Sequence, residues 1–169
     1  MPYDPQKHHR RSIRLRDYDY SHPGAYFVTV CAYQKTPHFG EIQDAVMLLN
    51  TSGQIAQNCW EELPGKLSMI ALDAFIIMPD HVHGILIMRK DRRGQSPEWE
   101  DRTTLGAVIR LYKASVTHQV HVALGSNIGP IWQRNYYERV IRDAAELDNV
   151  RRYITENPLR RWLRDHPSD

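Results

Sequence analysis

The sequence has few cysteines and no long apolar run, and both shortages narrow the classes of protein to consider. The two cysteines, Cys31 and Cys59, are not in a CxxC spacing, so we interpret them as buried thiols and not as a disulfide framework or a zinc knuckle. No apolar stretch approaches the roughly 18 residues that span a bilayer, and the N-terminal segment lacks the hydrophobic centre of a signal peptide. The sequence therefore predicts a cytoplasmic protein.

Net charge is also small, at +2 over 169 residues, but the positive residues are unevenly spread. They gather in three runs, at 10–16, 89–93 and 151–164. Each run taken alone is equally compatible with an ordinary solvated surface. Because a phosphate backbone responds to local basic surface, three runs on one domain of this size favour an anionic partner.

The pattern of apolar and turn residues predicts four strands and three helices. We expect strands over 25–33, 68–78, 81–88 and around 131–141. We expect a helix capped by Thr51 or Ser52 and stopped by Pro64-Gly65, and a second capped by Thr103 or Thr104. A last helix begins at Ala144 and ends at Asn157, because Pro158 disfavours helical geometry in the residue before it. The order β-α-β-β-α-β-α predicts an α+β, ferredoxin-like or RRM-like antiparallel sheet with helices on one face.

The stretch MPDHVHGILIM places two histidines in an otherwise apolar strand. Side chains alternate along a strand, so His81 and His83 share a face with Ile85, while Gly84 belongs to the other face. Two imidazoles side by side can ligate a divalent metal if another element supplies a third ligand. Without such a ligand, ordinary structural histidines are the better interpretation.

The last predicted helix carries Tyr153 and Asn157 four residues apart, on one face and one turn from each other. Tyr153 lies at the edge of the apolar stripe of this helix and would, by itself, be an interfacial aromatic. Beside a pair of metal-binding histidines it becomes a candidate nucleophile. A phenol can attack a phosphodiester when a metal ion polarises the phosphoryl oxygen.

Three segments, in this order, resemble the REP-associated tyrosine transposases, a branch of the single-strand transposases in the HUH endonuclease superfamily. They are RRSIRLRDYDYSHPGAYFVTVCAYQKTPHFG, MPDHVHGIL and IWQRNYYERVIRDAAELDNVRRYITENPL. The resemblance implies one HUH transposase-like domain over residues 1–169, with a basic N-terminal arm at 1–22 and a C-terminal tail at 158–169. The family commonly has Asn where this chain has Asp80, a difference that adds a carboxylate beside the first histidine.

The resemblance also implies a role for each site residue. His81 and His83 would be metal ligands, and Asn157 would be the third ligand through its carboxamide oxygen. Tyr153 would attack single-stranded DNA, leaving a 5′-phosphotyrosine and a free 3′-hydroxyl, and the reverse attack would rejoin the strand. Mg²⁺ or Mn²⁺ is the expected ion, because a carboxamide oxygen and water suit harder cations, although the histidines alone would equally suit zinc.

Relatives of this kind are associated with repetitive extragenic palindromes, whose single strands fold into hairpins, so such hairpins are the expected partner. We expect the arm residues Arg10, Arg11, Arg14 and Arg16 to bind DNA, with Arg110 and Lys113 as weaker phosphate contacts. Tyr18, Tyr20, Tyr136 and Tyr137 are candidates for stacking on unpaired bases. Tyr136 and Tyr137, which lie in a predicted strand, are more simply interpreted as half core. A monomer is favoured over a dimer.

Two alternatives use the same residues differently. A protein that binds single-stranded DNA or RNA without chemistry would keep its binding when Tyr153 is changed to Phe. A metal-dependent nuclease that uses water would still cleave after that change. The general base for a tyrosine nucleophile is not identified by the sequence, and Glu138 and Glu156 are more simply surface or structural residues.

Overall fold

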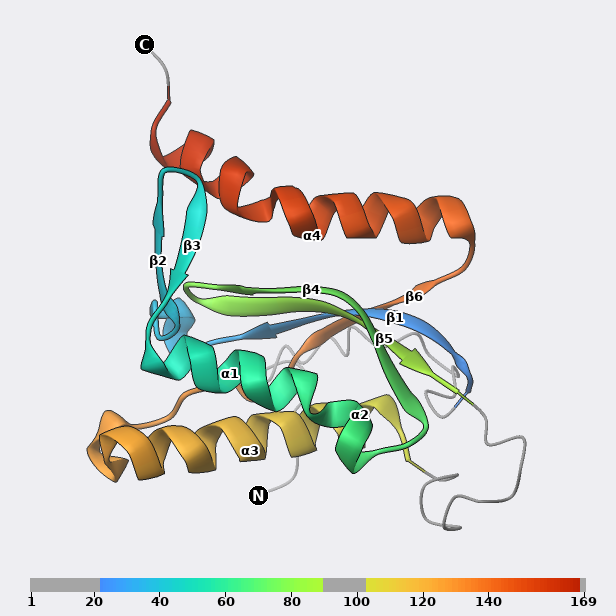
Figure 1. The fold of residues 1–169 in the computed structure, drawn as a ribbon, viewed down its shortest axis with the longest axis horizontal. Coiled ribbons are helices and arrows are strands. Elements are labelled where there is room, and N and C mark those ends of the chain that lie inside the picture. Colours follow the sequence, from blue (N-terminus) through green and yellow to red (C-terminus); the bar gives the residue numbers. More distant parts are fainter. Residues whose placement is uncertain (1–21, 90–102, 168–169) are drawn as a thin grey trace, which may run out of the picture.

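The computed structural model describes residues 22–89 and 103–167, which form a four-stranded sheet with helices on both faces (Figure 1). The strands are β1 (Gly24–Cys31), β4 (Ile70–Met78), β5 (His81–Met88) and β6 (Tyr137–Ile141), in the order β4-β5-β1-β6. Each neighbouring pair is antiparallel. The predicted α+β fold with an antiparallel sheet is therefore confirmed, and the histidine strand lies in the interior of the sheet.

Three helices cover one face of this sheet and one helix covers the other. The first set is α1 (Thr51–Glu61), α2 (Leu63–Lys66) and α3 (Leu105–Leu124), which Figure 1 shows on the side opposite α4 (Ala144–Asp165). We expected all helices on one face, and α4 is the difference. Its buried stripe packs on the sheet in a small group, the α4 cluster, made of Ile85, Ile141, Val150 and Ile154.

The alternation along β5 assigns each of its side chains to one of these two layers. Val82 and Leu86 belong to the larger core under α1 and α3, whereas Ile85 belongs to the α4 cluster. Gly84 faces α1 so closely that a Cβ there would lie 2.3 Å from the Trp60 ring. His83, one residue before Gly84, consequently points to the α4 side, as the sequence predicts.

A second, two-stranded hairpin was not predicted. It consists of β2 (Gly40–Gln43) and β3 (Val46–Leu49), and Figure 1 shows it beside the C-terminal end of α4. Its turn residues Asp44 and Ala45 have φ of 48° and 62°. Tight hairpin turns with positive φ usually contain glycine, so the sequence lacked the usual signal here. Short 3₁₀ helices at Tyr33–Lys35 and Ser126–Ile128 complete the described elements.

The N-cap of α3 agrees with the prediction, whereas the N-cap of α1 differs from it. Thr104 caps α3, its hydroxyl accepting a hydrogen bond from Ala107 N–H at 3.3 Å. The cap of α1 is Asn50, whose side chain accepts from Gly53 N–H at 3.0 Å, and not Thr51 or Ser52. Asn is among the strongest N-caps, which explains the preference. Pro64 and Gly65 lie within α2, directly after α1.

The predicted end of α4 at Asn157 is wrong, because the helix continues through Pro158 to Asp165. Residues 158–165, expected as part of a tail, are helical. Pro158 is buried, and ion pairs beyond it, Arg161 with Asp80 and with Asp165, hold the extra turns. Burial of the proline and the tertiary Arg161–Asp80 pair offset its local cost.

The last strand is shorter than predicted. β6 begins at Tyr137, while Ile131 and Trp132 are buried outside it, with Trp132 joined to Ala32 by an isolated bridge. Within residues 22–89 and 103–167, none of the helices combines the length and apolarity needed to cross a membrane.

Candidate active site

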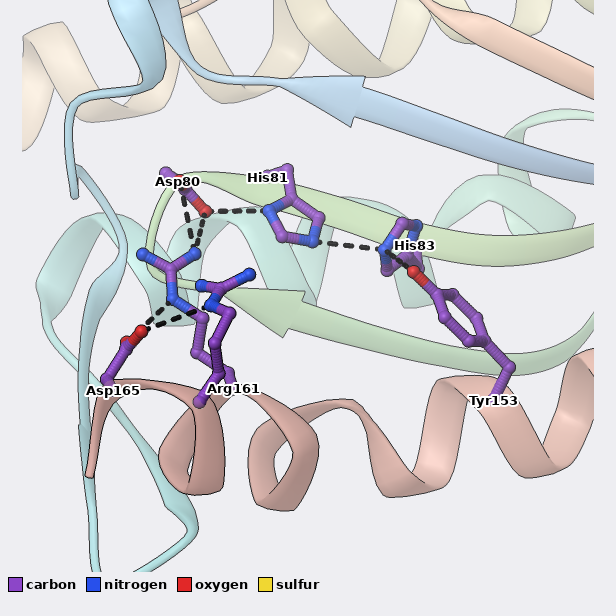
Figure 2. Close-up of polar contacts among 7 residues, drawn as sticks. Asp80, His81, His83, Tyr153, Arg161 and Asp165 are labelled. Carbon is purple, nitrogen blue, oxygen red and sulfur yellow. Dashed lines mark hydrogen bonds and ion pairs between the residues drawn. The ribbon is translucent and has the colours of Figure 1, made fainter. Parts of the chain in front are cut away.

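The two histidines of β5 face each other on the α4 side of the sheet (Figure 2). Nε2 of His81 lies 3.0 Å from Nε2 of His83, and the ring centroids are 4.4 Å apart. Strand alternation alone places the two rings on one face, and the hydrogen bonds on their far sides turn them inward. Two imidazole nitrogens are thus directed into the same small space.

Each Nδ1 is held by a different partner. Nδ1 of His81 lies 2.7 Å from a carboxylate oxygen of Asp80, and Nδ1 of His83 lies 2.8 Å from the Thr29 hydroxyl. Thr29 is the direct cross-strand partner of His83 in the β1–β5 register. Outer partners of this kind orient imidazoles that bind metals, because they leave Nε2 available.

Burial and neighbouring charges set the protonation of the centre of the site. Burial lowers the pKa of His83 to about 3, with the charge of His81 acting in the same direction and Asp80 opposing it. Burial alone would raise the pKa of Asp80, but the His81 and Arg161 contacts outweigh burial and lower it to about 2. At neutral pH, therefore, His83 is a neutral ring and Asp80 is a carboxylate.

Tyr153 reaches this centre from α4. Its Oη lies 3.4 Å from Nε2 of His83, as Figure 2 shows. Its ring packs edge-on against Phe27 and His83, at centroid distances of 6.0 and 5.3 Å. The side chain is nevertheless 39% exposed. The phenol oxygen is thus fixed beside the histidines while remaining open to a ligand.

Asn157 follows one helical turn after Tyr153 and is 8% exposed on the buried stripe of α4 that packs on the sheet. The structure therefore brings His81, His83 and Tyr153 together and places Asn157 on the sheet-facing side of the same helix. Within residues 22–89 and 103–167, Asn157 makes no hydrogen bond to either histidine.

Two arginine–carboxylate pairs fix α4 on either side of Tyr153. Near its start, Arg151 donates Nε and Nη2 to the two oxygens of Asp73, at 2.8 and 2.7 Å. Further along, Arg161 lies 3.3 Å from Asp80, in the turn before His81 (Figure 2). Asp73 lies in a bulge of β4 between Leu72 and Phe75. Sequence reasoning missed these clamps, since neither pair is close along the chain.

A groove runs along the sheet from the β6 edge to Tyr153, with a volume of about 1120 Å³. Its floor includes Phe27 and Thr29, and its walls come from β6, from the β6–α4 connection and from the first turns of α4. Tyr153 lines this groove at one side. The candidate nucleophile therefore borders a space large enough for part of a polymeric substrate.

The residues present fit a divalent metal at the histidine pair. Two ligand nitrogens at right angles around an ion with bonds of about 2.1 Å would be about 3 Å apart, and the observed Nε2 separation is 3.0 Å. Among the described residues, no group of three or more His, Cys, Asp or Glu side chains is placed to hold an ion. Asn157, on the sheet-facing side of α4, carries a carboxamide oxygen, a hard donor of the kind that suits Mg²⁺ or Mn²⁺.

Two of the predicted DNA-binding residues, Arg110 and Lys113, are not brought to this site. Arg110 and Lys113 lie on α3, under the opposite face of the sheet. The Lys113 ammonium donates to the backbone carbonyl of Gln133 and is half-buried, which lowers its pKa. The arm residues Arg10, Arg11, Arg14 and Arg16, with Tyr18 and Tyr20, lie outside the described residues.

The third basic run is largely neutralised within the protein. Ion pairs join Arg151 to Asp73 and Asp148, Arg160 to Glu156, and Arg161 and Arg164 to Asp165. Glu156, one neighbour of Tyr153 along the helix, is thereby engaged with Arg160 and not directed to the phenol. This run fixes the position of α4 more than it presents a basic surface.

Comparison with known proteins identifies a relative of this chain. No family model matches the chain. An uncharacterised protein of Haemophilus influenzae is 37% identical over 174 residues, which cover 96% of this chain and 95% of the relative. The two proteins belong to one family. That relationship carries no assigned activity.

Solved structures identify the fold. A REP-associated tyrosine transposase bound to a REP hairpin superposes with a TM-score of 0.60 and 20% identity, over 88% of this chain and 73% of that chain. The chain has the fold of a REP-associated tyrosine transposase. A candidate transposase from Deinococcus radiodurans shares this transposase fold, with a TM-score of 0.51 and 14% identity over 84% of this chain and 95% of that chain.

Within the transposase fold, one missed contributor to the site had a sequence signal that could have revealed it. Thr29 is the one aliphatic hydroxyl in the apolar stretch AYFVTVC, a polar residue that needs a buried partner. Asp80, expected as a carboxylate beside the first histidine, lies at Nδ1 of His81. Arg161 had no such signal, because the predicted helix ended before it.

Proposed function

We propose that this protein is a metal-dependent endonuclease and strand transferase for single-stranded DNA, with Tyr153 as its nucleophile. The observation that carries the proposal is the position of the Tyr153 oxygen, 3.4 Å from Nε2 of His83 and beside the pair of facing imidazoles. A nucleophile and an electrophilic centre must both reach one phosphate, and this distance allows it.

The chain's own residues would carry out a balanced transfer. The Tyr153 oxygen attacks the phosphorus, the bond between phosphorus and the 3′ oxygen breaks, and the phenolic proton is passed on as that oxygen becomes a 3′-hydroxyl. The 5′ phosphate then remains on Tyr153. Attack by a 3′-hydroxyl on this phosphotyrosine reverses the exchange and rejoins a strand.

His81, His83 and Asn157 would hold the divalent metal ion, with Mg²⁺ or Mn²⁺ as the expected ion. When bound, the ion would polarise the phosphoryl oxygen and offset its developing charge. Asp80 and Thr29 would orient the two imidazoles through their Nδ1 atoms. The two ion pairs that fix α4, Arg151–Asp73 and Arg161–Asp80, would keep Tyr153 beside these ligands.

The proposed substrate is a single strand that folds into a hairpin of the REP type. This choice rests on the solved transposase of the same fold, which is bound to a REP hairpin. The groove beside Tyr153 is compatible with an unpaired strand, since it is bordered by a helix and an edge strand.

The test is formation of a covalent adduct that survives SDS. Labelled hairpin strands from palindromic repeats beside the chain's own gene are incubated with the protein and Mn²⁺ or Mg²⁺. We expect an adduct that requires the metal and Tyr153, and none with Tyr153→Phe or His81→Ala. Tyr33→Phe is the matched control, since Tyr33 is 41% exposed and outside the site. The duplex form of each oligonucleotide controls for strand state.

Other outcomes identify the rival functions. Metal-dependent cleavage that persists in Tyr153→Phe would favour a nuclease that uses water. Binding without cleavage or adduct over a broad hairpin panel would favour a binding protein without chemistry.

A further inference from the structure

The groove that ends at Tyr153 contains an exposed aromatic ring that the proposed chemistry does not use. Tyr137 lies at the start of the edge strand β6 and is 49% exposed. In the sheet register, Tyr137 pairs with Thr29, and Thr29 pairs with His83. Cross-strand partners share a face, so the three side chains form a row on the α4 side that leads from the sheet edge to the histidines.

The path of the chain brings Tyr153 on α4 back to the level of Tyr137 on β6. β6 runs from Tyr137 to Ile141, and α4 then returns over the sheet from Ala144 (Figure 1). Four residue steps along β6, from Tyr137 to Ile141, and nine along α4, from Ala144 to Tyr153, each span about 14 Å. The two tyrosines therefore stand on opposite walls of one groove. Neighbouring strands are about 4.8 Å apart, which puts Tyr137 about 10 Å from His83 along the row.

One cation in this groove is available to a phosphate. Arg142 lines the groove at the connection from β6 to α4, and its side chain has no ion pair or hydrogen bond with any residue of 22–89 or 103–167. The second groove arginine, Arg139, is paired with Glu146.

The groove acids Asp143 and Glu146 are engaged in the start of α4. Asp143 accepts from Glu146 N–H at 2.8 Å, and Glu146 accepts from Arg142 N–H at 2.9 Å. These carboxylates thus serve as a helix cap and a partner for Arg139. Among the other residues that line the groove, Tyr137 offers an aromatic face and Arg142 a guanidinium to a ligand.

We propose that this groove is the path of the unpaired strand to Tyr153, with one base stacked on Tyr137 and one phosphate on Arg142. Single-stranded nucleic acid is the polymer that offers both an exposed base face and a phosphate at each step. Duplex DNA keeps its bases stacked internally and offers Tyr137 no face. This inference rests on the proposed function for its substrate class, and it adds the residues that guide the strand.

The test measures binding without chemistry, so every variant also carries Tyr153→Phe. The probes are fluorescent DNA hairpins from the same repeats, made with a single-stranded extension of several nucleotides or blunt. We expect Tyr137→Ala to weaken binding of the extended hairpin by about 5- to 150-fold, the usual range for one stacked base. Binding of the blunt hairpin should not change.

Arg142→Ala should weaken binding and lower the slope of log affinity against log salt by about 0.7, the value for one phosphate contact on a single strand. One matched control is Tyr33→Ala, a ring that is 41% exposed and lies outside the groove. The other is Arg134→Ala, an exposed arginine whose backbone carbonyl accepts a hydrogen bond from Lys113 of α3. Both controls should bind as the Tyr153→Phe protein does.

The proposal is overturned if Tyr137→Ala and Arg142→Ala bind the extended hairpin as tightly as their controls. It is equally overturned if the extension gives the Tyr153→Phe protein no added affinity over the blunt hairpin. The proposed function fails separately, by absence of an adduct in the Tyr153-containing protein. Groove-dependent binding without an adduct would preserve this inference and reject the chemistry.

Discussion

At the scale of the residue, His83 is the side chain on which the site converges. Thr29 lies at its Nδ1, while His81 and Tyr153 lie at its Nε2. Phe27 packs on the same ring at a centroid distance of 5.3 Å. Because burial lowers the pKa of His83, the ring stays neutral over the physiological range and keeps a lone pair for an electrophile.

Asp80 provides a test of how this pair of rings is oriented. Asp80→Ala should weaken Mn²⁺ binding by about 10- to 100-fold, the usual cost of losing an outer partner of a ligating histidine. Asp80→Asn should lose less, because its carboxamide oxygen can still accept from His81 Nδ1–H. The affinity is measured by the disappearance of the EPR signal of free Mn²⁺.

Asp148→Ala is the control for this measurement. Asp148 also pairs with an arginine of α4, but its side chain is 65% exposed. Within residues 22–89 and 103–167 it contacts neither histidine. Wild-type Mn²⁺ affinity in a folded Asp80→Ala protein would show that Asp80 does not orient a ligand.

At the scale of the element, β5 packs between two layers, and these layers require different side chains at neighbouring positions of the strand. His83 needs polar partners on the α4 side, while Gly84 must leave room for Trp60 on the α1 side. Gly84→Ala places a Cβ where the Trp60 ring lies and should destabilise the protein by about 1–3 kcal/mol, the range for overpacking. Urea denaturation measures this loss.

Gly65→Ala is the matched variant, because a Cβ there meets nothing within 4 Å. This change should leave stability unchanged or raise it slightly, since alanine restricts the unfolded chain. Equal effects of the two substitutions would argue against the close packing of Trp60 on β5.

The element α4 depends on ion pairs that respond to pH. The hydrogen bonds from Arg151, more than any other contact, lower the pKa of Asp73 below 3.8, although burial opposes them. A lowered folded-state pKa gives stability that is fully present above the unfolded pKa, about 3.9, and is lost as pH falls through the folded value. Asp73→Asn should therefore be less stable than wild type at pH 7.

The difference in unfolding free energy between these two proteins should shrink as pH falls below about 4. Other carboxyl groups, including Asp80, titrate in both proteins and cancel in the difference. Urea denaturation of both proteins at pH 7, 5, 4 and 3 measures this difference in unfolding free energy. A difference that is independent of pH would mean that the Asp73 carboxylate does not hold α4.

At the scale of the whole molecule, the two faces of the sheet are covered unequally. The larger core contains Trp60, Tyr112 and most other buried residues, whereas the α4 cluster has four. Segments with fewer buried contacts open at lower free energy. We expect amide protons of α4 to exchange through a local opening below the global unfolding free energy, and those of β1 and α3 only through global unfolding.

Native-state hydrogen exchange at increasing urea measures this prediction. Exchange of the α4 amides with the same free energy and urea dependence as the β1 amides would contradict it. Arg151→Ala should lower α4 protection further without changing that of α3, because Arg151 pairs with β4 and with α4 itself.

Much of this architecture follows from local patterns in the sequence. Alternation placed His81 and His83 on one face, and helical spacing placed Tyr153 and Asn157 on one face of the last helix. The groups that complete the site depend on contacts distant in the chain, such as Thr29 with His83 and Arg161 with Asp80. Register and helix docking decide such contacts, and short-range patterns do not report them.

The wrong or missing elements lie where the local sequence signal is misleading or absent. Pro158 predicts a helix end from local sterics, but burial and the Arg161 pairs beyond it keep the helix intact. The β2–β3 turn uses Asp44 and Ala45 at positive φ, without the glycine that usually marks such a turn. At Pro158, tertiary packing outweighs the local preference.

The order of elements along the chain has a consequence for biosynthesis. All four strands of the sheet precede α4, so the ribosome makes the histidine strand and the groove floor before it makes Tyr153. A nascent or prematurely terminated chain that ends before residue 153 has the sheet without the proposed nucleophile. Translation would then complete the strands of the proposed DNA-binding face before it supplies the proposed nucleophile.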